Sequence, residues 1–155
     1  MSTPAPPELE FAFEAIAEIG AVQDLGLTPH GRRRIIPVLG GRFEGPRLRG
    51  RILPGGADWQ ILRSDGMAEL DARYTLETEQ GALIYVSNRG MRHGPPGVLA
   101  RLNAGDAVDP GSYYFRTVAE FETGAPECDW LTRSIFIGVA ERYPDKVIVR
   151  FWKLL

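Results

Sequence analysis

The chain has 155 residues, a net charge of −2, and 44% hydrophobic and 25% charged residues. This length fits one domain with its own core, and the composition excludes a disordered chain. The pI near 5.7 lacks the basic excess of a nucleic-acid-binding surface, so no nucleic-acid partner is expected. The 18 glycines and 12 prolines favour many turns and short strands over long helices.

The location of the protein is predicted from three further features. The single cysteine, Cys128, has no partner for an internal disulfide, which fits a reducing compartment. The N-terminus lacks the basic and apolar regions of a signal peptide. No apolar run approaches the ~18 residues of a membrane-spanning helix. We therefore expect a soluble cytoplasmic protein without a membrane partner.

The first predicted elements follow a proline-rich tail at residues 1–7, and residues 8–155 are predicted to form one domain. Apolar residues alternate at Leu9, Phe11 and Phe13, which indicates a half-buried strand. Residues 26–34, which include three successive arginines, predict a solvent-exposed loop. Further strands are predicted at 35–38, 46–53, 59–63, 67–78, 82–89, 112–122, 134–142 and 147–154.

The segment 67–78 has the clearest alternation of the chain. Ala68, Leu70, Ala72, Tyr74 and Leu76 share one face, and the charged and polar residues between them share the other. The same period of two places Tyr85 and Asn88 on opposite faces of their strand, so at most one of them points inward unless a bulge intervenes.

The predicted architecture is all-β, with one short helix at 98–104 that ends before Gly105. The strands number about eight, and the short turns between neighbours predict an antiparallel sheet. Such a sheet closes, or nearly closes, into a barrel because closure removes exposed edges. A barrel of this size has an interior that side chains fill or that holds one small ligand.

No established catalytic motif is present. The sequence lacks phosphate-binding loops, zinc-binding motifs and nucleophile motifs, and it has only two histidines. We therefore expect no metal and no cofactor. Cys128 has no evident base beside it and is interpreted as a small core residue.

Two acids and two arginines are the candidates for chemistry. Asp65 precedes Gly66 at a predicted hairpin turn, so turn chemistry explains it most simply. Asp58 follows a glycine pair, which suits a residue at a barrel mouth, and is the preferred catalytic carboxylate. Arg73 and Arg116 lie in mid-strand and are predicted to point into the cavity, where a buried arginine needs an acidic partner.

The remaining candidates are ligand-binding residues. Aromatic side chains would wall a ligand, and polar ones would orient it. The predicted ligand-binding set is Trp59, Asp65, Tyr85, Asn88, Tyr114 and Trp130.

Several sequence strings, taken together, resemble one family, the domain of unknown function 3237. They are GP at 45–46, GRILPGGADWQILRSDG at 50–66, LDARYTLETEQGALIYV at 70–86, YYFRTVAEFETG at 113–124 and WLTRSIFIGVAER at 130–142. The resemblance covers residues 8–154. It implies an antiparallel barrel similar to allene oxide cyclase and a homodimer.

Three hypotheses for the function compete. The first is a cofactor-independent isomerase, cyclase or lyase acting on a small organic molecule with a carboxylate or carbonyl group. The second is a non-catalytic carrier or sensor of the lipocalin type. The third is a barrel whose acids and arginines only cross-link its interior. Fold alone does not separate them.

Overall fold

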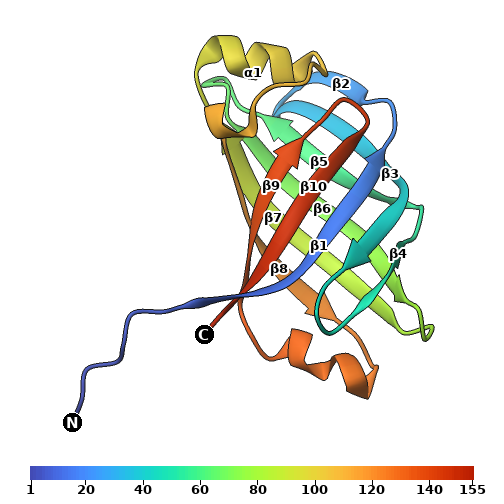
Figure 1. The fold of residues 1–155 in the computed structure, drawn as a ribbon. Coiled ribbons are helices and arrows are strands. Elements are labelled where there is room, and N and C mark those ends of the chain that lie inside the picture. The colour runs from blue at the N-terminus through green and yellow to red at the C-terminus, as the bar shows by residue number, and fades with distance from the viewer.

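The computed structural model describes residues 1–155 as a single antiparallel sheet that closes on itself (Figure 1). Its strands are β1 (Leu9–Ile19), β2 (Gln23–Thr28), β3 (Gly31–Glu44), β4 (Arg49–Ile52), β5 (Gly56–Leu62), β6 (Ala68–Thr78), β7 (Leu83–His93), β8 (Tyr114–Glu122), β9 (Phe136–Arg142) and β10 (Lys146–Leu154). The helix α1 spans Pro96–Asn103, and the 3₁₀ segments η1 and η2 span Pro110–Ser112 and Pro126–Thr132.

The ten strands occupy eight positions around the barrel. One half of β3 pairs with β2 and the other half with β1. On its opposite edge β3 pairs with β5 and β4 in the same way. The pairs β1/β2 and β4/β5 therefore each fill one position, and the pairing of β1 with both β3 and β10 closes the barrel. This confirms the predicted closed antiparallel barrel.

The predicted loop at 26–34 is wrong. The residues form the end of β2, a tight turn and the start of β3. In the turn the Thr28 hydroxyl donates to Gly31 O at 2.7 Å and accepts from His30 N at 3.1 Å. Arg34 and Ile36 lie two residues apart on the inner face of β3. Because Arg34 is charged where an apolar residue is expected, the strand pattern was not recognised in the sequence.

One end of the barrel is solid. Five phenylalanines, each at most 7% exposed, pack there with ring centroids 4.7–5.8 Å apart. They are Phe13, Phe43, Phe121, Phe136 and Phe151. The segment η2 lies across this end, and α1 lies at the opposite end (Figure 1). The apolar core thus holds the barrel closed at one end and leaves the other end for a cavity.

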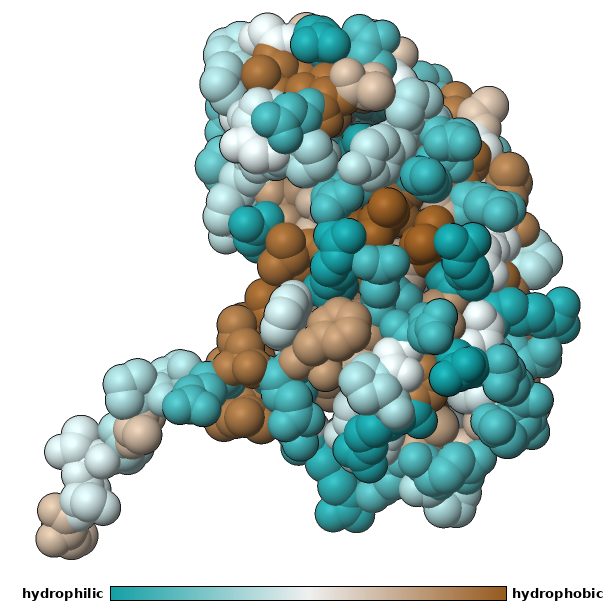
Figure 2. Space-filling view, viewed as in Figure 1, coloured by the Kyte–Doolittle hydropathy of each residue, from teal (hydrophilic) through white to brown (hydrophobic).

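Residues 1–7 carry no regular secondary structure and extend away from the barrel. Where the N-terminal segment meets the C-terminus, hydrophobic surface gathers on the outside (Figure 2). Its exposed residues include Leu9, Phe11, Ile135 and Leu155. No helix has the length and hydrophobicity needed to cross a membrane.

Candidate functional site: a cavity-lining acid and a cluster of arginines

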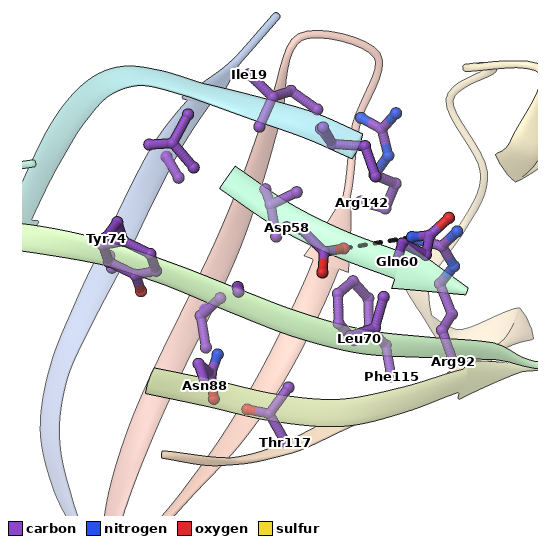
Figure 3. Close-up of a pocket in the computed structure, with 17 residues that line it drawn as sticks. Ile19, Asp58, Gln60, Leu70, Tyr74, Asn88, Arg92, Phe115, Thr117 and Arg142 are labelled. Carbon is purple, nitrogen blue, oxygen red and sulfur yellow. Dashed lines mark hydrogen bonds between the residues drawn. The ribbon is translucent and has the colours of Figure 1, made fainter. Parts of the chain in front are cut away.

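The barrel encloses a cavity toward the α1 end, lined by 17 residues, of which 11 are hydrophobic (Figure 3). All strands except β2 and β4 contribute to its wall. Its volume is about 70 Å³, well above the roughly 10–15 Å³ that a single water molecule requires. The cavity therefore suits a compact organic molecule.

Asp58 is the one carboxylate that lines this cavity. It lies on β5 opposite Ala72 of β6, and the pairing of these strands resumes only at Ile61 and Glu69. In the gap, the Asp71 amide donates to Asp58 Oδ1 at 2.9 Å. Gln60 Nε2 donates to Oδ2 at 3.4 Å. Backbone and side chain together thus hold the carboxylate in one orientation.

The environment of Asp58 shifts its acidity into the physiological range. Removal from water raises its pKa from 3.8 to about 6. The Asp71 amide, the charge of Arg92 and the Gln60 side chain each oppose the increase. The side chain is half-buried and borders the cavity rather than the outside of the barrel. A carboxylate with this pKa accepts and returns a proton near neutral pH.

Three buried arginines gather at the α1 end: Arg34, Arg92 and Arg142 are 6%, 3% and 7% exposed. Arg92 and Arg142 line the cavity itself. Asn103, at the end of α1, accepts from Arg34 Nη1 at 3.4 Å and from Arg92 Nη2 at 3.3 Å through one oxygen. Burial lowers the pKa of all three guanidinium groups, that of Arg92 to about 10.

Four buried polar atoms have no hydrogen-bond partner, and all belong to residues that line this cavity. They are Gln60 Oε1, Asn88 Oδ1, Arg92 Nε and Thr117 Oγ1. Unpaired buried polar atoms are rare in folded proteins because each one loses its hydrogen bonds to water. Their concentration around one space leaves several hydrogen-bonding groups free to pair with ordered water or with a polar ligand.

Of the predicted site residues, the structure brings only Asp58 and Asn88 into the cavity. Asn88 is 4% exposed and Tyr85 is 40% exposed, so the two lie on opposite faces of β7 as predicted. Tyr85 instead shares a shallow outer groove with Trp59 and Arg73.

The predicted inward orientation of Arg73 and Arg116 is wrong. Arg73 shares the outer face of β6 with Asp71, and its Nε donates to Asp71 Oδ1 at 3.2 Å. Arg116 lies on the outer face of β8 over the ring of Tyr114, at 5.3 Å. Tyr114 and Val118 share this outer face with Arg116, whereas the inner face of β8 carries Phe115 and Thr117.

Three further candidates also lie away from the cavity. Asp65 sits in an exposed turn, where its Oδ1 accepts from Met67 N at 3.1 Å, which supports the turn interpretation. Tyr114 faces outward and stacks on His93 with ring centroids 4.9 Å apart. Trp130, in η2, packs on Phe136 at the solid end of the barrel.

Sequence reasoning missed Arg34, Arg92, Arg142, Gln60 and Thr117. The available signal was period-two register. Thr117 lies between the apolar inner positions Phe115 and Ala119, and Arg34 lies two residues before Ile36. No group of three or more His, Cys, Asp or Glu side chains is arranged to hold a metal ion.

The fold and the site define a class of protein, an antiparallel β-barrel with a mostly apolar internal cavity that carries a few buried polar groups. The chain belongs to the family described as protein of unknown function (DUF3237), whose model matches residues 7–154. This confirms the family predicted from the sequence strings.

Three similar proteins place the chain within and around this family. A UPF0311 protein from Rhodopseudomonas palustris strain TIE-1 is 45% identical over 148 residues, which cover 96% of this chain and 97% of the relative. The crystal structure of a conserved protein of unknown function from Rhodopseudomonas palustris matches with a TM-score of 0.93 at 44% identity, covering 99% and 100% of the two chains. A hydroalkoxylation enzyme from Penicillium herquei is 31% identical over 86 residues, 56% of this chain and 57% of the enzyme.

Proposed function

We propose that the barrel binds a small organic molecule in its cavity and catalyses a proton transfer on it, with Asp58 as the acid and base. The reaction class is an isomerisation, a cyclisation or an elimination. The observation that carries the proposal is Asp58 itself, a fixed carboxylate with a pKa of about 6 that borders a mostly apolar cavity. A general base works best when its pKa lies near the working pH.

The two carboxylate oxygens of Asp58 are held unequally. Oδ1 accepts the short bond from the Asp71 amide, whereas Oδ2 accepts only the 3.4 Å bond from Gln60. Oδ2 is therefore the oxygen that exchanges a proton with the ligand. It removes the proton from a carbon or hydroxyl group and returns it to another atom of the same molecule.

The arginine side chains stabilise the charge that this step creates. When Asp58 takes a proton, negative charge develops on an oxygen of the ligand. Arg92 and Arg142 line the same cavity and are both buried, so their charge is weakly screened by water. The proton transfer thus moves negative charge from Asp58 toward fixed positive groups.

The hydroalkoxylation enzyme from Penicillium herquei supports this reaction class. Addition of a hydroxyl group across a carbon–carbon double bond removes a proton from oxygen and delivers one to carbon. When both groups belong to one molecule, the addition closes a ring. The acid and base that such a reaction needs are available in this cavity as a single carboxylate.

Isotope exchange tests the proposal on a panel of candidate substrates. The protein is incubated in D₂O with small ketones, enones and alkenols, and the products are followed by NMR. We expect deuterium incorporation or isomerisation with the wild type and its loss in Asp58→Asn. Ligand binding with equal, uncatalysed exchange in both proteins would instead establish a carrier.

A further inference from the structure

The α1 end of the cavity holds an excess of buried positive charge. None of the ion pairs in the structure involves Arg34, Arg92 or Arg142. The side-chain partner that Arg34 and Arg92 share is the neutral amide of Asn103. Buried arginines are normally paired with carboxylates because an isolated charge loses its hydration. This cluster lacks that compensation.

The other charged groups that face the cluster do not neutralise it. Asp58 is the only carboxylate on the cavity side. On the outer side Asp24 interacts with Arg34, but it already pairs with Arg32 at 2.7 Å. Two carboxylates, Asp58 and Asp24, therefore face four arginines, namely Arg32 and the three of the cluster. An excess of positive charge remains.

Arg92 has unused hydrogen-bonding capacity beside the cavity. It is 3% exposed, its Nε has no partner, and its one hydrogen bond to a side chain is the 3.3 Å contact with Asn103. Its guanidinium group lies over the ring of Phe115 at 5.5 Å, which holds it against one wall. A guanidinium with a free edge binds a carboxylate through two parallel hydrogen bonds.

An outer hollow lies on the far side of the same cluster. It is lined by Arg34, Asn103 and Asp24, among others, and Arg142 borders both the hollow and the inner cavity. The backbone N–H of Arg142 donates to the Tyr113 hydroxyl at 2.9 Å, which anchors this end of β9. Arginines thus line both the outer hollow and the inner cavity, and such a concentration of positive charge attracts anions.

We propose that the substrate is a small organic carboxylate, whose carboxylate group binds Arg92 and Arg142 and whose reacting carbon lies beside Asp58. The inference rests on the proposed function of the same cavity. Figure 3 shows Arg92 and Arg142 on one side of Asp58, and Asn88 and Thr117 on the other. The unpaired atoms of Asn88 and Thr117 would contact a second polar group at the far end of the molecule.

The test compares two probes of equal size, crotonate and crotonamide, which differ in charge. Binding to the wild-type protein is measured by ligand-observed NMR and calorimetry. We expect crotonate to bind at least about tenfold more tightly than crotonamide, since only the anion pairs with the guanidinium groups. Equal affinities, or no crotonate binding up to about 10 mM, beyond the millimolar range of weak specific complexes, would overturn the inference.

Matched variants locate the binding site. Arg92→Gln should weaken crotonate binding by about tenfold or more and leave crotonamide binding unchanged. Arg73→Gln, on the outer face, is the control and should change neither. Unchanged crotonate affinity in a folded Arg92→Gln protein would overturn the assignment. If that variant does not fold, the wild-type comparison of the two probes decides.

Asp58→Asn separates this inference from the proposed function. The variant should bind crotonate at least as tightly as the wild type, because it loses a negative charge beside the anion. It should at the same time lose isotope exchange. Tight crotonate binding with no exchange in the wild type, either of crotonate or of any compound of the panel, would remove the proposed catalysis and leave the anion site in place.

Discussion

The inner and outer faces of β5 and β6 carry similar residues in different physical settings. On the outer face Arg73 pairs with Asp71 at 3.2 Å, and both side chains are at least 33% exposed. On the inner face Asp58 of β5 borders the cavity, together with Arg92 of β7, the strand that pairs with β6. Water screens the outer pair, so it contributes little, whereas burial shifts the pKa of the inner groups. Charged residues in a strand therefore mark a site only when they face the inside.

The largest expected difference between the faces concerns turnover. Asp58→Asn should lower the proton-transfer rate by about two to four orders of magnitude, since it removes the proton acceptor. Arg73→Gln should leave the rate unchanged. In the wild type the rate should rise with pH through about 6, as Asp58 ionises. A variant rate within about tenfold of the wild type, measured by exchange NMR, would remove Asp58 from the mechanism.

Asp58→Asn should also stabilise the protein at neutral pH. The pKa of Asp58 is raised from 3.8 to about 6, so the folded state binds the proton more tightly than the unfolded state. Wild-type stability therefore falls as pH rises from about 4 to about 6. Asparagine mimics the neutral acid, and at pH 7 Asp58→Asn should be more stable by as much as about 3 kcal/mol, at 1.36 kcal/mol per pKa unit.

Urea unfolding at pH 4 and pH 7 measures this effect. The stability difference between wild type and variant should nearly vanish at about pH 4, where both side chains are neutral in the folded state. A variant that is less stable than the wild type at pH 7 would show that the ionised carboxylate has a structural role instead.

A smaller effect is expected for the acid in the outer turn. Asp65→Ala removes the hydrogen bond from Met67 N and the contact with Arg63. The Tm should fall by about 2–4 °C, as for the loss of one turn interaction in a chain of this size. Turnover and crotonate affinity should stay at wild-type values. Any loss of turnover would indicate that Asp65 acts in the functional site.

The smallest effect is expected for Arg73. Its partner Asp71 also lies within 3.6 Å of Arg89, so the carboxylate keeps a cation when Arg73 is removed. Arg73→Gln should therefore leave the Tm within about 1 °C of the wild type, because exposed ion pairs add little. Differential scanning calorimetry checks this value. A large decrease would indicate that the outer groove is a structural element.

The local sequence pattern was enough to predict much of this fold. The alternation in 67–78 predicted β6 with its correct faces, and the turn at Asp65-Gly66 lies where its residues predicted it. The sequence predicted a short helix that stops before Gly105, and in the structure Gly105 follows α1 with a φ of +88°. These features depend on neighbours in sequence, through the two-residue period of a strand and the freedom of glycine. The choice of Asp58 over Asp65 also came from local context.

Where both faces of a strand are mixed, only the tertiary structure decided which face is inside. This was so for β8, whose faces gave no direction for Arg116, whereas in β6 the apolar face opposite Arg73 already indicated that Arg73 points outward. Pairing between distant strands, such as β1 with β3 and β10, closes the barrel and settles the direction for every strand. The same closure brings Arg34, Arg92 and Arg142 from three separate strands to one end of the cavity. The three arginines are buried together, and so concentrate positive charge beside the cavity, only once the barrel has closed.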